Sequence, residues 1–133
     1  MLKAVFMSQG YDRELIDSVF GKNSLDVISK YAEIYPELID NDNLEEHKEY
    51  LKDMDVAFAT WGMPRLSEEE ISQYFPKLKA VFYAGGSVQY FARPFIKKGI
   101  IVVSAWAANA IPVAEYTLAQ ILLANKGFFQ NAL

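Results

Sequence analysis

The sequence predicts an α/β protein, a flavodoxin-like three-layer sandwich built around a five-stranded parallel sheet. Short segments made almost wholly of apolar residues recur along the chain, and segments with helical spacing or helix-capping residues separate them. Strands that are apolar throughout are typical of a parallel sheet with helices on both faces. A length of 133 residues fits one such domain, which would bury roughly two thirds of its unfolded surface.

Five segments are the expected strands. Four of them are apolar runs bounded by turn residues, such as residues 2–7 (LKAVFM) before Ser8. The remaining one is ambiguous, because Leu25 and Ile28 have helical spacing while the residues from Ala32 onward suit a strand. The expected strands are residues 2–7, 32–35, 55–60, 78–83 and 99–104.

Helix-start signals mark several of the segments between the strands. Residues 67–74 open with Ser67 and three acidic residues, and residues 43–52 begin with Asn43, both of which are good capping residues. Pro112 is expected in the first turn of the last helix, where proline is well tolerated. Gly21 is expected to interrupt the first helical segment. The expected helices are residues 11–20, 43–52, 67–74 and 112–126.

Composition and charge exclude several classes of function. The formal net charge is −4, the pI is near 5.0 and the basic residues are scattered, which argues against a nucleic-acid partner. The absence of cysteine excludes a disulfide framework and cysteine-based chemistry. No stretch approaches the ~20 apolar residues of a membrane span, and the N-terminus lacks a secretory signal pattern. We therefore expect a soluble cytoplasmic protein with no membrane partner.

Ligand sites in such sheets lie beyond the carboxyl ends of the strands, so the loops there are of interest. One of them contains Gly85, Gly86, Ser87 and Val88. Paired glycines can adopt positive φ and bring backbone N–H groups close to an anion such as a carboxylate. The same pattern also suits a tight turn that only needs small residues. The loops of interest are residues 8–10, 61–65, 85–89 and 105–111.

Three other side chains have both a functional and a structural interpretation. The amide of Asn109 would donate to a carboxylate or carbonyl, or it would cap the helix that Pro112 begins. Trp61 is either a pocket wall or a core aromatic. His47 lies among charged residues and is expected to face solvent, so no Ser-His-Asp or metal-binding set can be assembled.

The last helix is apolar almost all round, which is typical of a buried helix. We expect the sheet to cover one side of it and something else to cover the other, because an exposed apolar patch of this size marks an interface. Its polar positions are few. They are Glu115, Tyr116, Thr117 and Gln120.

Residues 78–124 resemble the substrate-binding domain of the D-isomer-specific 2-hydroxyacid dehydrogenases. The matching motifs are Ala84-Gly85 after a strand, the run Lys-Gly-Ile-Ile-Val at residues 98–102, and Asn-Ala-Ile-Pro-Val-Ala-Glu-Tyr-Thr at residues 109–117. The last of these is the most specific. Ser87 and Gln89 stand where the family usually has a second glycine and an aspartate, so the substrate is not specified by the resemblance.

The resemblance implies a role for each matched residue. The backbone of Gly85, Gly86, Ser87 and Val88 would bind the substrate carboxylate, with Asn109 beside it. Trp61 would line the substrate pocket, and Thr117 would lie on the cofactor side of the linking helix. The parent enzyme would transfer a hydride between NAD or NADP and a small 2-oxo or 2-hydroxy acid.

The resemblance also implies what this sequence lacks. The family's catalytic Arg, Glu and His, and its Gly-x-Gly-x-x-Gly dinucleotide loop, lie downstream of the matched helix, so no catalytic residue is expected in this chain. Residues 1–108 would be the substrate-binding (catalytic) domain, and residues 109–133 an interdomain helix leading to a missing Rossmann domain. We expect the chain to be truncated, inactive by itself and without bound cofactor.

A different class of function also fits the sequence. The chain could be a stand-alone flavodoxin-like binding module that forms a homodimer through its apolar last helix, as a two-fold symmetric interface would allow. A phosphoacceptor domain of the same topology does not fit, because Thr60 stands where an aspartate is needed.

Overall fold

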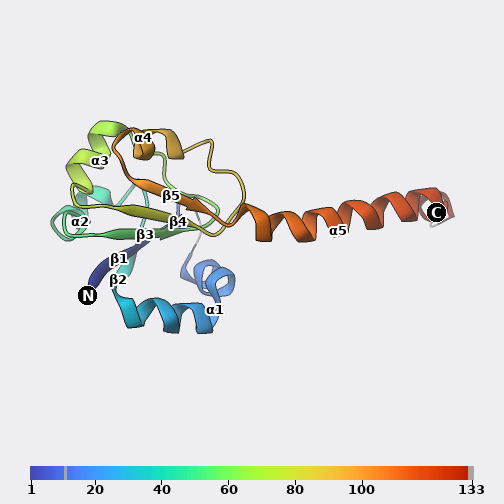
Figure 1. The fold of residues 1–133 in the computed structure, drawn as a ribbon, viewed down its shortest axis with the longest axis horizontal. Helices are drawn as coiled ribbons and strands as arrows, with labels where there is room; N and C mark the ends of the chain where they lie inside the picture. The colour runs from blue at the N-terminus through green and yellow to red at the C-terminus, as the bar shows by residue number, and fades with distance from the viewer. Residues whose placement is uncertain (11, 132–133) are drawn as a thin grey trace.

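Five parallel strands form a single sheet in the order β2-β1-β3-β4-β5 (Figure 1). This is the flavodoxin-like order, and it confirms the predicted fold class. The computed structural model describes residues 1–10 and 12–131. The strands are β1 (Leu2–Met7), β2 (Ala32–Ile39), β3 (Val56–Ala59), β4 (Ala80–Tyr83) and β5 (Ile101–Ser104).

Six helices lie within the described residues, and only α2 and α3 closely match the prediction. Helix α1 continues past Gly21 to Tyr31, and α6 was not predicted. A short helix that was not predicted, α4, precedes β5, and α5 begins at Trp106 rather than at Pro112. Tyr11, where the first helix was expected to start, lies outside the described residues. The helices are α1 (Arg13–Tyr31), α2 (Leu44–Leu51), α3 (Glu68–Tyr74), α4 (Ala92–Lys97), α5 (Trp106–Asn125) and α6 (Phe128–Asn131).

The local signals at the helix starts were partly correct. Ser67 caps α3 in a reciprocal capping box with Glu70, as the acidic first turn indicated. Gly21 has a φ of 68° and kinks α1, so the predicted interruption is confirmed. Asn43 occupies the cap position of α2, but its side-chain oxygen accepts from the Asp40 backbone instead of from the helix.

The main hydrophobic core lies on one face of the sheet, under α2, α3 and α4. Val5 and Val81 of the central strands are fully buried there, and Leu51, Ile71 and Phe95 cover them from the helices. Each such side chain contributes about 1.5–3 kcal/mol when it leaves water. Helices α2, α3 and α4 therefore cover this face of the sheet.

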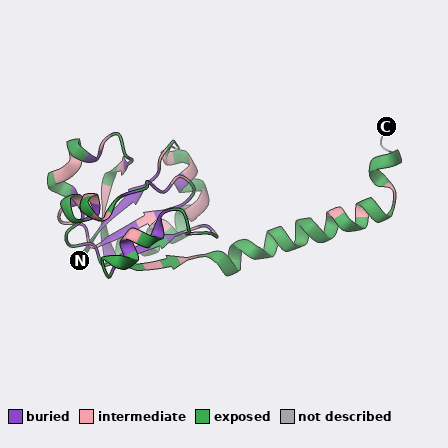
Figure 2. Cartoon of the chain, turned by 90° about the horizontal axis from the view of Figure 1, so that it is seen from above, coloured by how far each residue is buried: buried purple, intermediate pink, exposed green. Residues whose placement is uncertain are grey.

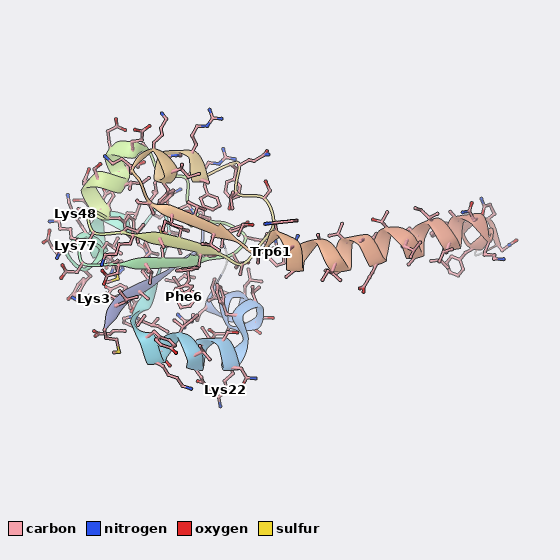
Figure 3. The ribbon with its side chains drawn as sticks, in the orientation of Figure 1. Lys3, Phe6, Lys22, Lys48, Trp61 and Lys77 are labelled. Atoms are coloured by element: carbon pink, nitrogen blue, oxygen red, sulfur yellow. The ribbon has the colours of Figure 1, made fainter. Side chains whose placement is uncertain are left out.

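The opposite face of the sheet is only half covered. Phe6 lies between the sheet and α1, where its ring packs edge-on against Phe20 at a centroid distance of 5.2 Å (Figure 3). Beyond α1 the apolar side chains of β4 and β5 stay open, since Phe82, Ile101 and Val103 are 37%, 64% and 44% exposed. The expectation that helices cover both faces is therefore wrong for the β4–β5 half.

Helix α5 projects away from the sheet, and no residue of it is buried (Figures 1 and 2). The sheet was expected to cover one side of it, but the helix continues outward from the end of β5 instead of folding back. Among residues 1–10 and 12–131, no helix is both long and apolar enough to cross a bilayer. The whole apolar surface of α5 is therefore left open.

Asp55 fixes the starts of three neighbouring strands. Its carboxylate accepts the Lys3 backbone N–H at 2.9 Å and lies 2.6 Å from the Lys79 ammonium, and its backbone carbonyl accepts the N–H of Lys79. Lys79, and then the Lys3 N–H, hold the pKa of Asp55 below its usual range. Because folding lowers this pKa, the stabilisation is present above the ordinary Asp range near pH ~4 and is lost as the pH falls through the lowered value.

We expect Asp55→Asn to lower the free energy of unfolding by about 1 kcal/mol at pH 7, because the charged acceptor is lost. Urea denaturation between pH 2 and 7 measures this, and the difference from wild type should shrink at the acidic end. Asp17→Asn is the control, since Asp17 pairs with Arg13 on an exposed turn of α1. An equal loss in both variants would contradict the strand-fixing role.

Candidate functional site

Loops from four strands meet at the carboxyl edge of the sheet, as parallel pairing requires. Buried hydroxyl groups tie them together: Ser8 after β1 donates to the Trp61 carbonyl at 3.4 Å, and Thr60 after β3 donates to the Ala84 carbonyl at 3.4 Å. Figure 3 places Trp61 at this edge, where α5 leaves the sheet. These contacts connect the loops after β1, β3 and β4.

Two carbonyl groups of the loop after β4 point toward the end of β5. The Ser104 hydroxyl at the end of β5 lies 3.0 Å from the Gly85 carbonyl oxygen and 2.5 Å from that of Gly86. Within residues 1–10 and 12–131, no hydrogen bond uses the N–H of Gly85, Gly86, Ser87 or Val88 as donor. These N–H groups therefore remain free to donate to a ligand or to water.

The two glycines are needed for space and not for positive φ. The sequence predicted positive φ, but neither Gly85 nor Gly86 has it. A Cβ on Gly85 would lie 2.6 Å from the Tyr83 ring, and one on Gly86 would lie 3.0 Å from the Asn109 amide nitrogen. Close approach of neighbouring groups therefore explains the glycine pair.

Asn109 lies inside the first turns of α5 and does not cap the helix. Its backbone N–H donates to the carbonyl of Ala105, which occupies the cap position, and Pro112 stands seven residues into the helix. Its side chain is held over Gly86. The interpretation of Asn109 as a cap is therefore wrong, and the glycine loop, the Asn109 amide and the uncapped N-terminus of α5 lie together.

Helix N-termini attract anions through their free N–H groups and dipole, which here adds to the donors of the loop. An anion suits this donor set, because neither the glycine loop nor the first turn of α5 contains an acidic side chain that would repel it. The described part of the chain holds no group of three His, Cys, Asp or Glu side chains that could bind a metal ion.

Two tyrosines and an arginine beside the loop were missed by the sequence analysis. Tyr83 lies against Gly85, and Tyr90 packs edge-on against Tyr83 at a centroid distance of 6.5 Å. Burial and a hydrogen bond with Tyr83 raise the pKa of Tyr90, so its hydroxyl stays protonated. The Arg65 guanidinium lies 5.5 Å from the Tyr90 ring and brings a cation to the rim. Arg65 comes near Tyr90 only after β3 pairs with β4, so no sequence motif marks this contact.

The remaining predicted residues have separate positions. Trp61 is half exposed at the carboxyl edge, so it is not a core aromatic. Thr117 lies eight residues beyond Asn109 on α5, roughly 12 Å along the helix, and its hydroxyl donates to the Val113 carbonyl. His47 is half-buried on α2 and hydrogen bonds to Tyr35 at 2.8 Å, instead of facing solvent.

Three solved structures similar to this chain come from one enzyme family. D-lactate dehydrogenase from Aquifex aeolicus, crystallised with NAD and lactic acid, matches with a TM-score of 0.58 and 26% identity over 91% of this chain and 33% of its own. A phosphoglycerate oxidoreductase from Vibrio cholerae matches with a TM-score of 0.55 and 15% identity, over 78% and 31% of the two chains. A glyoxylate reductase from Paecilomyes thermophila gives 0.52 and 13%, over 77% and 32%.

All three are D-2-hydroxyacid dehydrogenases, which confirms the resemblance predicted from the motifs. The two matches below 25% identity support the fold alone. This chain spans about a third of the length of each of these structures. No protein-family model and no curated protein sequence matches the chain.

Alanine substitutions at Gly85 and Gly86 should have different effects on stability. We expect Gly85→Ala to lower the free energy of unfolding by about 1–3 kcal/mol, because the buried Tyr83 ring cannot move aside. Gly86→Ala should cost less than about 1 kcal/mol, since only the end of the Asn109 side chain must shift. Thermal unfolding measures both. In NMR spectra, the Asn109 side-chain amide should move in Gly86→Ala; an unmoved signal would contradict the contact.

Proposed function

We propose that this chain is the substrate-binding part of an NAD(P)-dependent oxidoreductase that interconverts small 2-hydroxy and 2-oxo acids. The observation that carries the proposal is the row of N–H donors at residues 85–88 beside Asn109 and the start of α5. The likeness to a D-lactate dehydrogenase crystallised with NAD and lactic acid supports it. The activity of the whole enzyme would need the part of the parent that this chain does not span.

In this proposal the backbone N–H groups of Gly85, Gly86, Ser87 and Val88 bind the substrate carboxylate. Asn109 donates its amide to the same carboxylate or to the adjacent oxygen at C2. Holding the acid by several donors fixes the orientation of C2 before the reaction, which lowers the entropic part of the barrier. Trp61 would close the pocket on the β3 side.

The residues of this chain do not fit a nicotinamide dinucleotide. The loop at Gly85-Gly86 lacks the third glycine of a dinucleotide-binding turn, and the only histidine, His47, is held by Tyr35 away from the site. The hydride partner and the proton-transferring groups would therefore belong to a second domain. Residues 1–108 would form the substrate domain, with residues 109–133 leading out of it and Thr117 facing the cofactor. That boundary falls within α5, three residues after its start at Trp106.

A second candidate function is a stand-alone binding module that self-associates without catalysis. The exposed apolar side chains of α5 favour it, because a homodimer would cover them. Light scattering separates the two candidates in part, since a module of this kind must be a dimer at micromolar concentration, whereas substrate binding does not require one.

We expect a small 2-oxo acid such as pyruvate to shift the backbone amide signals of residues 85–88 and the Asn109 side-chain signal in an NMR titration. Asn109→Asp should weaken binding at least about tenfold, because it places a carboxylate against the substrate carboxylate. The variant should still fold, since an acid near a helix N-terminus is tolerated. Asn131→Asp on α6 is the matched control. Shifts confined to other surfaces would overturn the proposal.

Calorimetric titration with NAD should show no binding in the micromolar range. The reason is the missing dinucleotide turn. The same experiment with NADP is the control for cofactor preference. Micromolar affinity for either one would show that this chain holds a nucleotide site that the proposal denies.

A further inference from the structure

Both tryptophans of the chain lie at the carboxyl edge of the sheet, one on each side of the glycine loop (residues 85–88). Trp61 follows β3, and Trp106 begins α5 directly after β5. Strand β4, which leads into the glycine loop, lies between β3 and β5 in the sheet. Trp61 is found where α5 leaves the sheet (Figure 3), which is also where Trp106 begins the helix. The strand order therefore places an indole on each flank of the loop.

The strand register puts these two residues level with the first glycine of the loop. The pairing on both sides of β4 continues past the strand ends, through donation from the N–H of Ala84 at 2.8 Å and from that of Ala105 at 3.0 Å. Counted two residues beyond the last paired positions of the three strands, Trp61, Gly85 and Trp106 share one level. Neighbouring strands are about 4.8 Å apart, so the two tryptophan backbones lie on the order of 10 Å from each other.

Trp106 lies on the side of α5 that meets the glycine loop. It precedes Asn109 by three residues, so the two side chains are neighbours roughly 60° apart around the helix axis. The Asn109 amide is held over Gly86. The indole of Trp106 therefore lies beside the donors of the loop, on the same side of the helix as Asn109.

Both indoles are open to solvent. Trp61 is 50% exposed and Trp106 is 68% exposed. A single exposed aromatic side chain is common on protein surfaces, but two at one ligand-binding edge form an apolar patch. An indole is among the largest apolar groups in proteins, so this patch offers a large area that a bound molecule can cover.

The surroundings of the glycine loop provide no second charged group. Residues 84–90 and 104–113 contain no acidic or basic side chain. The Arg65 guanidinium at the rim is held over the Tyr90 ring, 5.5 Å from its centroid. A ligand with one carboxylate and an apolar side chain matches this surface, whereas a second carboxylate would lie against apolar groups without a partner.

We infer that the 2-oxo acid bound at this site carries an aromatic side chain, which lies between Trp61 and Trp106. This inference rests on the function proposed above and names its substrate class. The N–H groups of the loop hold the carboxylate, and the two indoles pack against the ring in offset or edge-on contact. Phenylpyruvate is the simplest such acid. Pyruvate has only a methyl group at the same position and leaves most of the indole surface uncovered.

Fluorine NMR of the chain labelled with fluorotryptophan tests the contact directly, because only two tryptophans give signals. We expect phenylpyruvate to shift both signals together with the amide signals of residues 85–88. Its affinity should be at least about tenfold higher than that of pyruvate. Benzyl alcohol, a ring without a carboxylate, is the control and should shift neither tryptophan signal at the same concentration. 2-Oxoglutarate, with a second carboxylate, should bind no more tightly than pyruvate.

Trp106→Ala should lower the affinity for phenylpyruvate about tenfold more than the affinity for pyruvate, and Trp106→Phe should recover most of that loss. Tyr116→Ala is the matched control and should leave both affinities unchanged. Tyr116 lies on the same helix, roughly 15 Å beyond Trp106, and is equally exposed, at 67% against 68%.

The titrations separate failure of this inference from failure of the proposed function. Equal affinities for pyruvate and phenylpyruvate, or tightest binding of 2-oxoglutarate, would overturn the inference while shifts at residues 85–88 still support the proposed function. Phenylpyruvate that shifts the tryptophan signals without residues 85–88 would also overturn the inference, because its ring would then bind outside the site. If none of the three acids shifts residues 85–88, both are wrong.

Discussion

The parallel pairing of β4 with β5 positions nearly everything that gives this chain a candidate function. Ala105 continues the pairing by donating its N–H to the Tyr83 carbonyl, so α5 begins directly beside the end of β4. Ser104 then holds the carbonyl groups of the glycine loop, which leaves the N–H groups of that loop without a protein acceptor. Asn109 reaches Gly86 only because its helix starts at this point. A shift of one residue in this register would turn Ser104 to the other face of the sheet.

The same pairing leaves two apolar surfaces without a cover. The open half of the sheet lies beside β5, and α5 extends from the end of that strand (Figure 2). A protein rarely exposes this much contiguous apolar surface without an interaction to make. Either the proposed second domain or a second copy of the chain would cover part of this surface.

Local sequence signals predicted much of the fold. The apolar runs gave four strands almost at their final bounds, Ser67 with its acids gave the start of α3, and Gly21 gave the kink. The misses have physical reasons. Pro112 is best tolerated at a helix start, yet the helix begins earlier because β5 ends beside β4 and the backbone turns there. Helix α4 was missed because it is one short turn-and-a-half between Phe91 and Lys98, without a capping signal.

The sequence by itself determined the class of fold and the order of the strands with most of the helices between them, because these depend on periodicity and turn chemistry. It could not decide why Gly85 and Gly86 are glycines, since the crowding comes from Tyr83 and from Asn109 in another element. Nor could it place Arg65 at Tyr90, or show that α5 leaves the sheet altogether. Such contacts between distant segments exist only after the strands pair, so tertiary structure alone decides them.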